Sequence, residues 1–200
     1  MKLIAGLGNP GDAYKGTRHN VGFETIDKLS FDFNISMKSD RKFRAHVGSI
    51  KGEGKIISQI MLVKPMTYMN LSGEAVRALL NFYKLPPSEL IVIYDDVSLP
   101  VGDIRVRERG GANGQKGMQN IISQLGTDEF TRVRIGIGSM PPSWTLSDYV
   151  LSRFLREEWE DMIAGITKAG DAVQLILNEG TTAAMNFYNK KIVKEQSQNE

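Results

Sequence analysis

The chain has 200 residues, of which 24% are charged and 41% are hydrophobic, as expected of one soluble α/β domain with a core of its own. Its net charge of +2 is too small to indicate nucleic-acid binding, so any such role must depend on where arginine and lysine are placed. Cysteine is absent, which excludes disulfides and thiolate chemistry, and the two histidines, His19 and His46, are too few to predict a multi-histidine metal site.

Hydrophobic periodicity predicts strands and helices along the whole chain. The first apolar run is too short for a signal peptide or a membrane span, so we expect a cytoplasmic protein. In chain order, the predicted elements are a strand at 2–7, a helix at 21–29, strands at 43–50 and 56–63, a helix at 74–84, strands at 90–94 and 103–109, a helix at 118–125, a strand at 132–138 and a helix at 157–178. Gly180 ends that helix, and Thr181 or Thr182 can cap a short final one.

These elements predict the fold class. We expect a single α/β domain over residues 1–190, with a mixed twisted β-sheet surrounded by α-helices, and a polar, frayed tail at 191–200. The runs at 56–63 and 90–94 are almost continuously apolar, as central strands covered on both faces require. The segment 103–109 is predicted to add an edge strand.

Three loops follow predicted strands, at residues 8–20, 64–70 and 95–103. If these strands are parallel, all three loops leave the sheet at the edge where open α/β sheets place their sites. The polar side chains expected to converge there are Asn9, His19, Asn70, Asp95 and Asp96.

Residues 6–11 read Gly-Leu-Gly-Asn-Pro-Gly, the letters of a dinucleotide-binding fingerprint. That fingerprint needs a helix beginning at the second glycine and an acidic residue about 20 positions on, after a second strand. Here the helical pattern begins only near Val21, and the segment around Asp32 is not a convincing strand. We therefore expect the glycines to shape a loop that holds Asn9 and His19, and NAD(P) binding remains an alternative based on those letters alone.

His19 is the candidate general base, because an imidazole has an unperturbed pKa of about 6.5 and works best when a carboxylate holds its other nitrogen. Asp95, after a buried-type strand, is the candidate carboxylate. Alternatively, His19 only packs at a helix start beside Asn20, a candidate N-cap, and Asp95 with Asp96 forms a turn that caps backbone amides. His46 is predicted to be a solvated surface residue.

No activated nucleophile accompanies this histidine, since the sequence has no Gly-x-Ser-x-Gly elbow and no His-Glu-x-x-His metal motif. A histidine base without either favours direct activation of water, which suits an activated ester. Asn9 and Asn70 would orient the substrate and stabilise the oxyanion, although Asn70 can instead cap the helix that begins near Leu71.

Four stretches, "GLGNPGDAYKGTRHNVGF", "KPMTYMNLSGEAV", "YDDVSLPVGDIRVR" and "RVRIGIG", together closely resemble the bacterial peptidyl-tRNA hydrolase family, in matching order over residues 2–138. The resemblance implies a metal-independent and cofactor-free esterase that cleaves the ester between a peptide and the tRNA 3′ ribose. It implies that His19 takes a proton from water, that Asp95 holds His19, and that Asn9 distinguishes blocked from unblocked aminoacyl-tRNA. Positions that contact the acceptor end and the peptide match Tyr14, Tyr68 and Asn70.

One motif departs from the family, which usually reads Gly-Gly-His-Asn-Gly before the helix at 118–125 and contacts substrate through the asparagine. This chain reads "RGGANGQKGMQNI". A gapless alignment places Gln115 at the histidine and Lys116 at the asparagine, and a slip of three residues would use Asn113 instead. We favour Lys116, because a slip would misplace the core face of the helix, but a lysine loses the amide acceptor.

Period-two geometry puts Arg105, Arg107 and Arg109 on one face of their strand, and Arg132 with Arg134 on one face of theirs. If these faces adjoin near the site, they form a basic clamp for acceptor-stem phosphates, for which the resemblance implies Arg107 and Arg134. The alternative is that arginines on an exposed strand only prevent edge pairing.

The main functional hypothesis is therefore an esterase acting on peptidyl-tRNA, and the alternative is a non-catalytic RNA-binding protein on the same scaffold. We expect a monomer. The segment 141–154 can be a lid over the site or a surface loop pinned by Trp144 and Tyr149.

Overall fold

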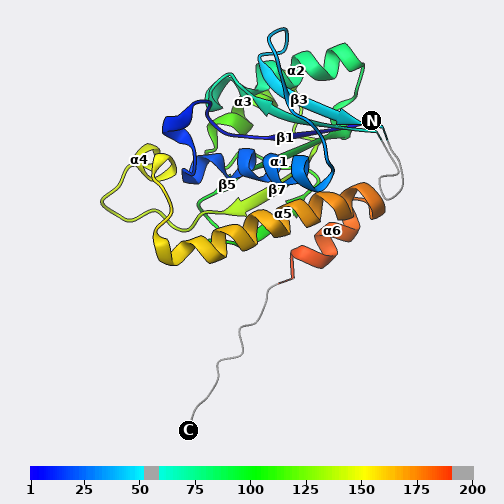
Figure 1. Ribbon diagram of the computed structural model, residues 1–200. Coiled ribbons are helices and arrows are strands. Elements are labelled where there is room, and N and C mark those ends of the chain that lie inside the picture. Colours follow the sequence, from blue (N-terminus) through cyan, green and yellow to red (C-terminus); the bar gives the residue numbers. More distant parts are fainter. Residues whose placement is uncertain (52–58, 191–200) are drawn as a thin grey trace.

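The computed structural model describes residues 1–51 and 59–190. The beginning of the strand predicted at 56–63 and the tail predicted at 191–200 lie outside this part of the chain. One seven-stranded sheet runs through the described residues in the order β2-β3-β4-β1-β5-β7-β6 (Figure 1). Its strands are β1 (Lys2–Gly6), β2 (Lys38–Asp40), β3 (Ala45–Ile50), β4 (Ile60–Pro65), β5 (Leu90–Asp96), β6 (Ile104–Arg107) and β7 (Thr131–Gly136).

The sheet is mixed, as predicted. Strands β4, β1, β5 and β7 run parallel in its centre, whereas β6 is antiparallel to β7 and β3 is antiparallel to both β4 and β2. Every residue of β5 is buried, as a central parallel strand requires. The edge position of β6 is confirmed. Strand β2 is not predicted, because its three residues are polar and offer no apolar alternation to detect.

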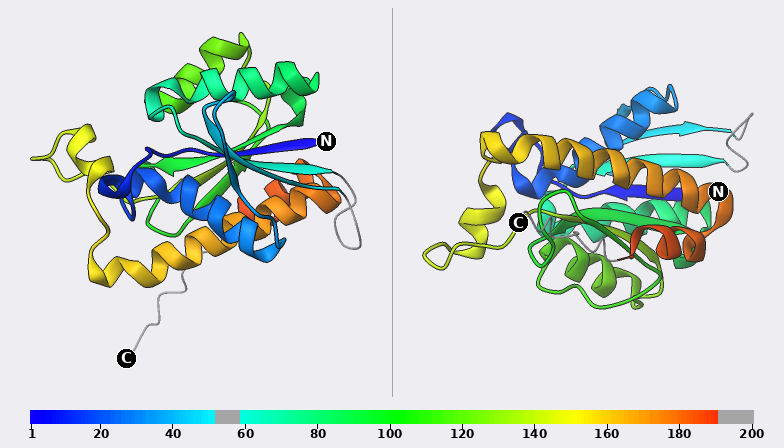
Figure 2. Two further views of the ribbon diagram at one scale, coloured as in Figure 1. Left: turned by 45° about the horizontal axis from the view of Figure 1, so that its top comes forward. Right: turned by 90° about the horizontal axis from the view of Figure 1, so that it is seen from below.

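Helices cover both faces of the sheet, α2 and α3 on one and α1, α5 and α6 on the other (Figures 1 and 2). Their bounds are α1 (Val21–Asp32), α2 (Ser72–Tyr83), α3 (Lys116–Leu125), α4 (Leu146–Leu151), α5 (Trp159–Glu179) and α6 (Thr181–Tyr188). Successive side chains of β1 point to opposite faces of the sheet. Leu3 and Ala5 therefore join the core under α2 and α3, and Ile4 joins the core under α1 and α5.

Two local predictions are wrong. Residues 141–154 are not a loop throughout, because Thr145 caps α4 by accepting the Asp148 N–H at 3.2 Å. Neither Thr181 nor Thr182 caps α6: Gly180 occupies the cap position, and the two hydroxyl groups bond to other side chains. Among the helices of the described chain, none is long and apolar enough to cross a membrane.

The glycines at residues 6–11 allow close packing of the first strand against the first helix. A Cβ atom on Gly6 would lie 2.1 Å from the carbonyl oxygen of Gly22, so only glycine lets β1 and α1 approach so closely. Helix α1 begins at Val21 and not at Gly8, as the sequence indicates. The geometry that would place helix amides on a pyrophosphate is therefore missing from this turn.

Candidate active site

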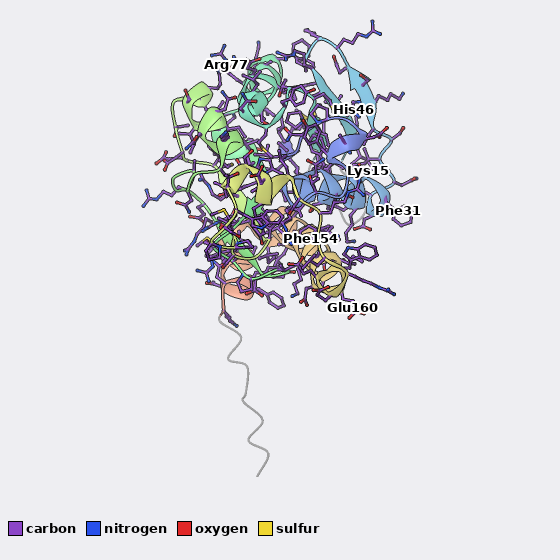
Figure 3. The ribbon with its side chains drawn as sticks, turned by 90° about the vertical axis from the view of Figure 1, so that its left-hand side faces the viewer. Lys15, Phe31, His46, Arg77, Phe154 and Glu160 are labelled. Carbon is purple, nitrogen blue, oxygen red and sulfur yellow. The ribbon has the colours of Figure 1, made fainter. Side chains whose placement is uncertain are left out.

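The carboxyl ends of β1, β4 and β5 meet at the edge of the sheet that lies toward α4, on the left of Figure 1. The loops that leave these strands, together with α4 and the start of α3, line a cavity of about 400 Å³. Figure 3 looks at the molecule from this side. The cavity is lined by the predicted residues Asn9, His19, Tyr68, Asn70, Asp95, Asp96 and Lys116. The structure thus brings the polar groups of the three loops together.

His19 and Asp95 form a buried pair in the cavity wall. His19 Nδ1 lies 2.8 Å from Asp95 Oδ2, and the two residues are 8% and 3% exposed. His19 belongs to a short 3-10 helix, Arg18–Asn20, and Asp95 lies near the end of β5. Because Nδ1 is engaged by the carboxylate, Nε2 is the ring nitrogen left to exchange a proton with a water or a substrate.

Asn9 is held by three hydrogen bonds, two to its backbone and one that orients its side-chain amide. Its backbone N–H donates to Asn20 Oδ1 at 2.8 Å, and Asn20 Nδ2 donates to the Asn9 carbonyl at 3.0 Å. Asn9 Oδ1 accepts the backbone N–H of Met69 at 2.8 Å, which leaves Nδ2 as its remaining donor. Asn20 is the N-cap residue of α1, as predicted, but its side-chain amide makes no cap bond, because Asn9 occupies it.

Asp96 has a different role from its neighbour. Its Oδ1 accepts the backbone N–H and the hydroxyl of Ser98, and its Oδ2 forms an ion pair with Arg134. Burial alone would raise the pKa of Asp96, but these hydrogen bonds and the guanidinium outweigh it and hold the pKa below its usual value. Asp96 thus caps a turn, which the sequence offers as an alternative for both aspartates.

Gln115 is a buried cavity residue whose contact is not predicted. Its Nε2 donates to Asp95 Oδ1 at 3.0 Å, and its Oε1 caps α3 by accepting the Met118 N–H at 2.7 Å. Two features of the sequence point to Gln115. It directly precedes a helical pattern, and the gapless alignment places it at the position of the family's histidine. Nothing in that pattern indicates Asp95 as its partner, 20 residues away in the chain.

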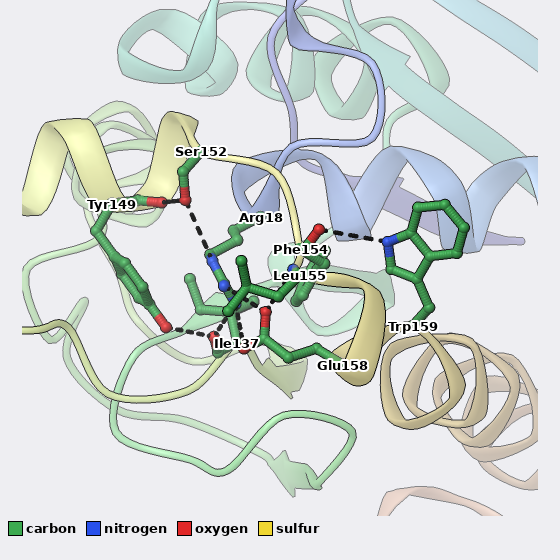
Figure 4. A network of polar contacts seen from close by, with 8 residues as sticks. All are labelled: Arg18, Ile137, Tyr149, Ser152, Phe154, Leu155, Glu158 and Trp159. Atoms are coloured by element: carbon green, nitrogen blue, oxygen red, sulfur yellow. Dashed lines mark hydrogen bonds and ion pairs between the residues drawn. The ribbon is translucent and has the colours of Figure 1, made fainter.

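Arg18 ties the histidine segment to α4 and to the start of α5 (Figure 4). Its guanidinium donates to the Ile137 carbonyl at 2.8 Å and pairs with Glu158, while Tyr149 and Phe154 pack their rings against it. A buried arginine with this many partners fixes the backbone next to His19. Helix α4 is held against the histidine segment, because the backbone N–H of Arg18 donates to the carbonyl of Ser152, the first residue after α4.

The described side chains contain no group of three or more His, Asp or Glu residues arranged to hold a metal ion.

A sequence profile of peptidyl-tRNA hydrolases matches residues 3–197, nearly the whole chain. The peptidyl-tRNA hydrolase of Lachnoclostridium phytofermentans is 49% identical over 192 residues, which cover 96% of this chain and 98% of that protein. The corresponding protein of Chloroflexus aggregans is 48% identical over 191 residues, or 94% of this chain and 99% of that one. The chain belongs to the peptidyl-tRNA hydrolase family. A crystal structure of peptidyl-tRNA hydrolase from Acinetobacter baumannii superposes with a TM-score of 0.86 at 35% identity, covering 93% of each chain.

Of the two aromatic residues implied by the family, Tyr68 lines the cavity and Tyr14 packs against it. Tyr14 and Tyr68 pack edge to face with ring centroids 6.2 Å apart, and Tyr68 is 54% exposed. Tyr68 has a φ of 59°, a conformation that costs energy for a tyrosine. Asn70 is exposed at the cavity and does not cap α2, whose N-cap residue is Leu71.

Lys116 and Asn113 both line the cavity, so the choice between them as the counterpart of the family's asparagine stays a prediction. Lys116 is the first residue of α3, and Asn113 lies in the preceding turn with a φ of 48°. Met118 and Ile121 are buried on α3, which agrees with the gapless alignment.

The arginines of β6 and β7 adjoin, since Arg105 pairs with Arg134 and Arg107 with Arg132 in the register of the two strands. Arg132 is not available for phosphate, because it is 1% exposed and donates to the carbonyls of Gly110, Gly111 and Asp128. The basic clamp predicted from the sequence therefore loses Arg132. Arg107 is exposed and Arg134 pairs with Asp96, but neither arginine is among the residues that line the cavity.

Proposed function

We propose that this chain hydrolyses the ester that joins a peptide to the 3′ ribose of tRNA, with His19 as the general base for the attacking water. The carrying observation is the 2.8 Å contact between His19 Nδ1 and Asp95 Oδ2 in the wall of the cavity. Membership of the family supplies the substrate class, since its similar members are named for this activity. The proposed enzyme acts in the cytoplasm as a monomer and needs no metal or cofactor.

The reaction begins with a water bound at His19 Nε2. That nitrogen takes a proton as the water oxygen attacks the ester carbonyl carbon, and Asp95 stabilises the imidazolium through Nδ1–H. The tetrahedral intermediate then expels the 3′ oxygen of the ribose, which receives the proton from Nε2. One water is consumed, the peptide leaves with a free carboxyl group, the tRNA regains its hydroxyl, and His19 returns to its neutral form.

Asn9 supports the selection of blocked substrates. Its Oδ1 is engaged by Met69, so Nδ2 is available as a donor to a carbonyl oxygen of the substrate. A peptidyl group carries an amide carbonyl on its α-nitrogen, whereas an unblocked aminoacyl group carries a cationic amine that cannot accept a hydrogen bond. Asn70 supplies a second amide at the cavity for the developing oxyanion.

The tRNA is held by side chains at the cavity and on the adjoining strands β6 and β7. Arg107, Arg134 and Lys116 contact phosphates, and Tyr14 with Tyr68 offers aromatic faces to the unpaired 3′ end. Phosphate contacts carry no sequence information, so one such surface serves many tRNAs.

Release of N-acetylaminoacyl groups from tRNA tests the proposal. We expect His19→Ala to lower kcat by about 10²–10⁴-fold, the usual contribution of a general base. The matched control is His46→Ala, which changes the chain's other histidine. His46 lies on β3, and this variant keeps the parental rate. Unchanged turnover in His19→Ala would remove the proposed base. A parent protein that binds tRNA without releasing the acyl group would favour the non-catalytic RNA-binding alternative.

A further inference from the structure

The carboxylate of Asp95 is held through both of its oxygen atoms. Oδ2 lies 2.8 Å from His19 Nδ1, and Oδ1 accepts Gln115 Nε2 at 3.0 Å. All three residues are buried, with exposed fractions of 8% or less. A carboxylate with one partner can rotate about its last bond, but one with a partner on each oxygen cannot, so Gln115 contributes to the plane in which Asp95 meets the imidazole.

The orientation of the Gln115 amide is determined by α3. Its oxygen accepts the backbone N–H of Met118 at 2.7 Å, a bond that only the oxygen of the amide can make. The nitrogen must therefore face Asp95. Met118 and Ile121 anchor α3 in the core, so this donor is carried by a rigid element.

The same amide nitrogen also touches Met69, whose sulfur lies 3.1 Å away. The backbone N–H of Met69 in turn orients Asn9. Gln115 thus links the residues proposed to activate water with the residue proposed to select the substrate.

The chemistry of the partner matters as much as its position. Asp96 is paired with a guanidinium, which neutralises its charge, whereas the second partner of Asp95 is a neutral amide. An amide fixes the carboxylate and leaves its negative charge to stabilise an imidazolium at His19. An amide also has no proton to gain or lose between pH 5 and pH 9.

We propose that Gln115 is a positioning residue for the hydrolysis, which holds Asp95 against His19 without neutralising it and does so equally at every working pH. This inference depends on the proposed function. It assigns to this chain a third member of the histidine–carboxylate arrangement, located at the N-cap of α3.

The decisive variant is Gln115→Glu, which keeps the shape and the oxygen that caps α3 but replaces the donor to Asp95 with an acceptor. We expect kcat at neutral pH to fall about tenfold or more with KM for N-acetylaminoacyl-tRNA nearly unchanged, since only the proton transfer is disturbed. The added negative charge also favours the imidazolium, so the pH below which kcat/KM falls moves upward by about one unit. Gln119→Glu, the same change at an exposed position of α3, is the matched control and keeps the parental profile.

A role limited to capping α3 predicts a parental kcat and pH profile for Gln115→Glu, and that result would overturn the proposal. If this variant does not fold, as judged by circular dichroism, Gln115→Met replaces it, since methionine has a similar volume and no donor. A parental kcat in folded Gln115→Met would overturn the proposal equally. The proposed function fails separately, through an unaffected His19→Ala variant or an inactive parent, so the two failures are distinguishable.

Discussion

The polar side chains at the two ends of the cavity are held by different kinds of interaction. At the histidine end, His19, Asp95 and Asn9 are buried, Asp95 contacts His19, and the second partner of Asp95 is the neutral amide of Gln115. At the arginine end, Asp96 and Arg134 neutralise one another as an ion pair. The comparison shows that two adjacent aspartates in one cavity wall can receive different kinds of partner, a histidine and a neutral amide for Asp95 and a guanidinium for Asp96.

The largest expected effect comes from removing the carboxylate at the histidine end. Asp95→Asn lowers kcat by about 10³–10⁴-fold, because an asparagine stabilises neither the required tautomer nor the imidazolium. Measurement uses single-turnover release from N-acetylaminoacyl-tRNA. Asp96→Asn is the control next in sequence, and a loss of kcat as large as that of Asp95→Asn would contradict the distinction between the two ends.

Replacing Arg18 measures how much its contacts with Glu158 and with the loop carbonyls stabilise the fold next to His19. Arg18→Met leaves Glu158 without its partner and lowers the free energy of unfolding by about 2–4 kcal/mol in urea denaturation. The matched control is Lys28→Met, which breaks the more exposed pair with Asp32 and costs about 0.5 kcal/mol or less. Equal losses would mean that the Arg18 network does not stabilise this end.

Asp96→Asn should reveal the pH dependence of the arginine end. Although burial opposes it, hydrogen bonding to Ser98 and Arg134 places the folded-state pKa of Asp96 below 3.8. The carboxylate therefore stabilises the fold above that pH, and this stabilisation is lost as the pH falls through the folded-state value. The difference in unfolding free energy between the parent and Asp96→Asn should be constant down to about pH 5 and narrow below pH 4. If the difference in unfolding free energy instead grows below pH 4, the pKa of Asp96 is not lowered in the folded state.

The smallest expected effect is at Arg107. Arg107→Gln raises KM for the tRNA substrate a few-fold, leaves kcat unchanged, and reduces the slope of log KM against log salt concentration by about 0.7–0.9, the value for one lost phosphate contact. Arg77→Gln changes an exposed arginine on α2, which Figure 3 places away from Lys15 and Phe154, and serves as the control. An unaltered salt slope in Arg107→Gln would remove this residue from the proposed tRNA surface.

Most of the fold was predictable because its elements carry strong local periodicity. The buried runs of β4 and β5 and the apolar faces of α1, α2, α3 and α5 can be recognised from residues near to one another in the chain. Strand β2 has only three polar residues, and its pairing with β3 creates it. Helix α4 has six residues, too few for a periodic pattern, and depends on the Thr145 cap and on packing against the histidine segment.

The candidate site was predictable only in part. Strand order and the parallel arrangement bring Asn9, His19 and Asp95 to one edge, and both follow from apolar strands that end in polar loops. The turn in which Asp96 accepts the Ser98 N–H is local, and the choice of Asp95 as the partner of His19 was made from its place after a buried strand and from the family resemblance. The burial of Arg132 and the role of Gln115 depend on contacts with loop carbonyls and with another strand, which a period-two pattern cannot reveal.

The amino-acid sequence by itself determined the α/β class, the central strands and the family, because hydrophobic periodicity and ordered motifs are properties of neighbouring residues. Only the tertiary structure decided which arginines remain open to solvent, which side chain caps the turn after β5, and which amide holds the Asp95 carboxylate. The physical reason is that hydrogen-bond partners and burial are set by atoms that come together only when distant segments pack.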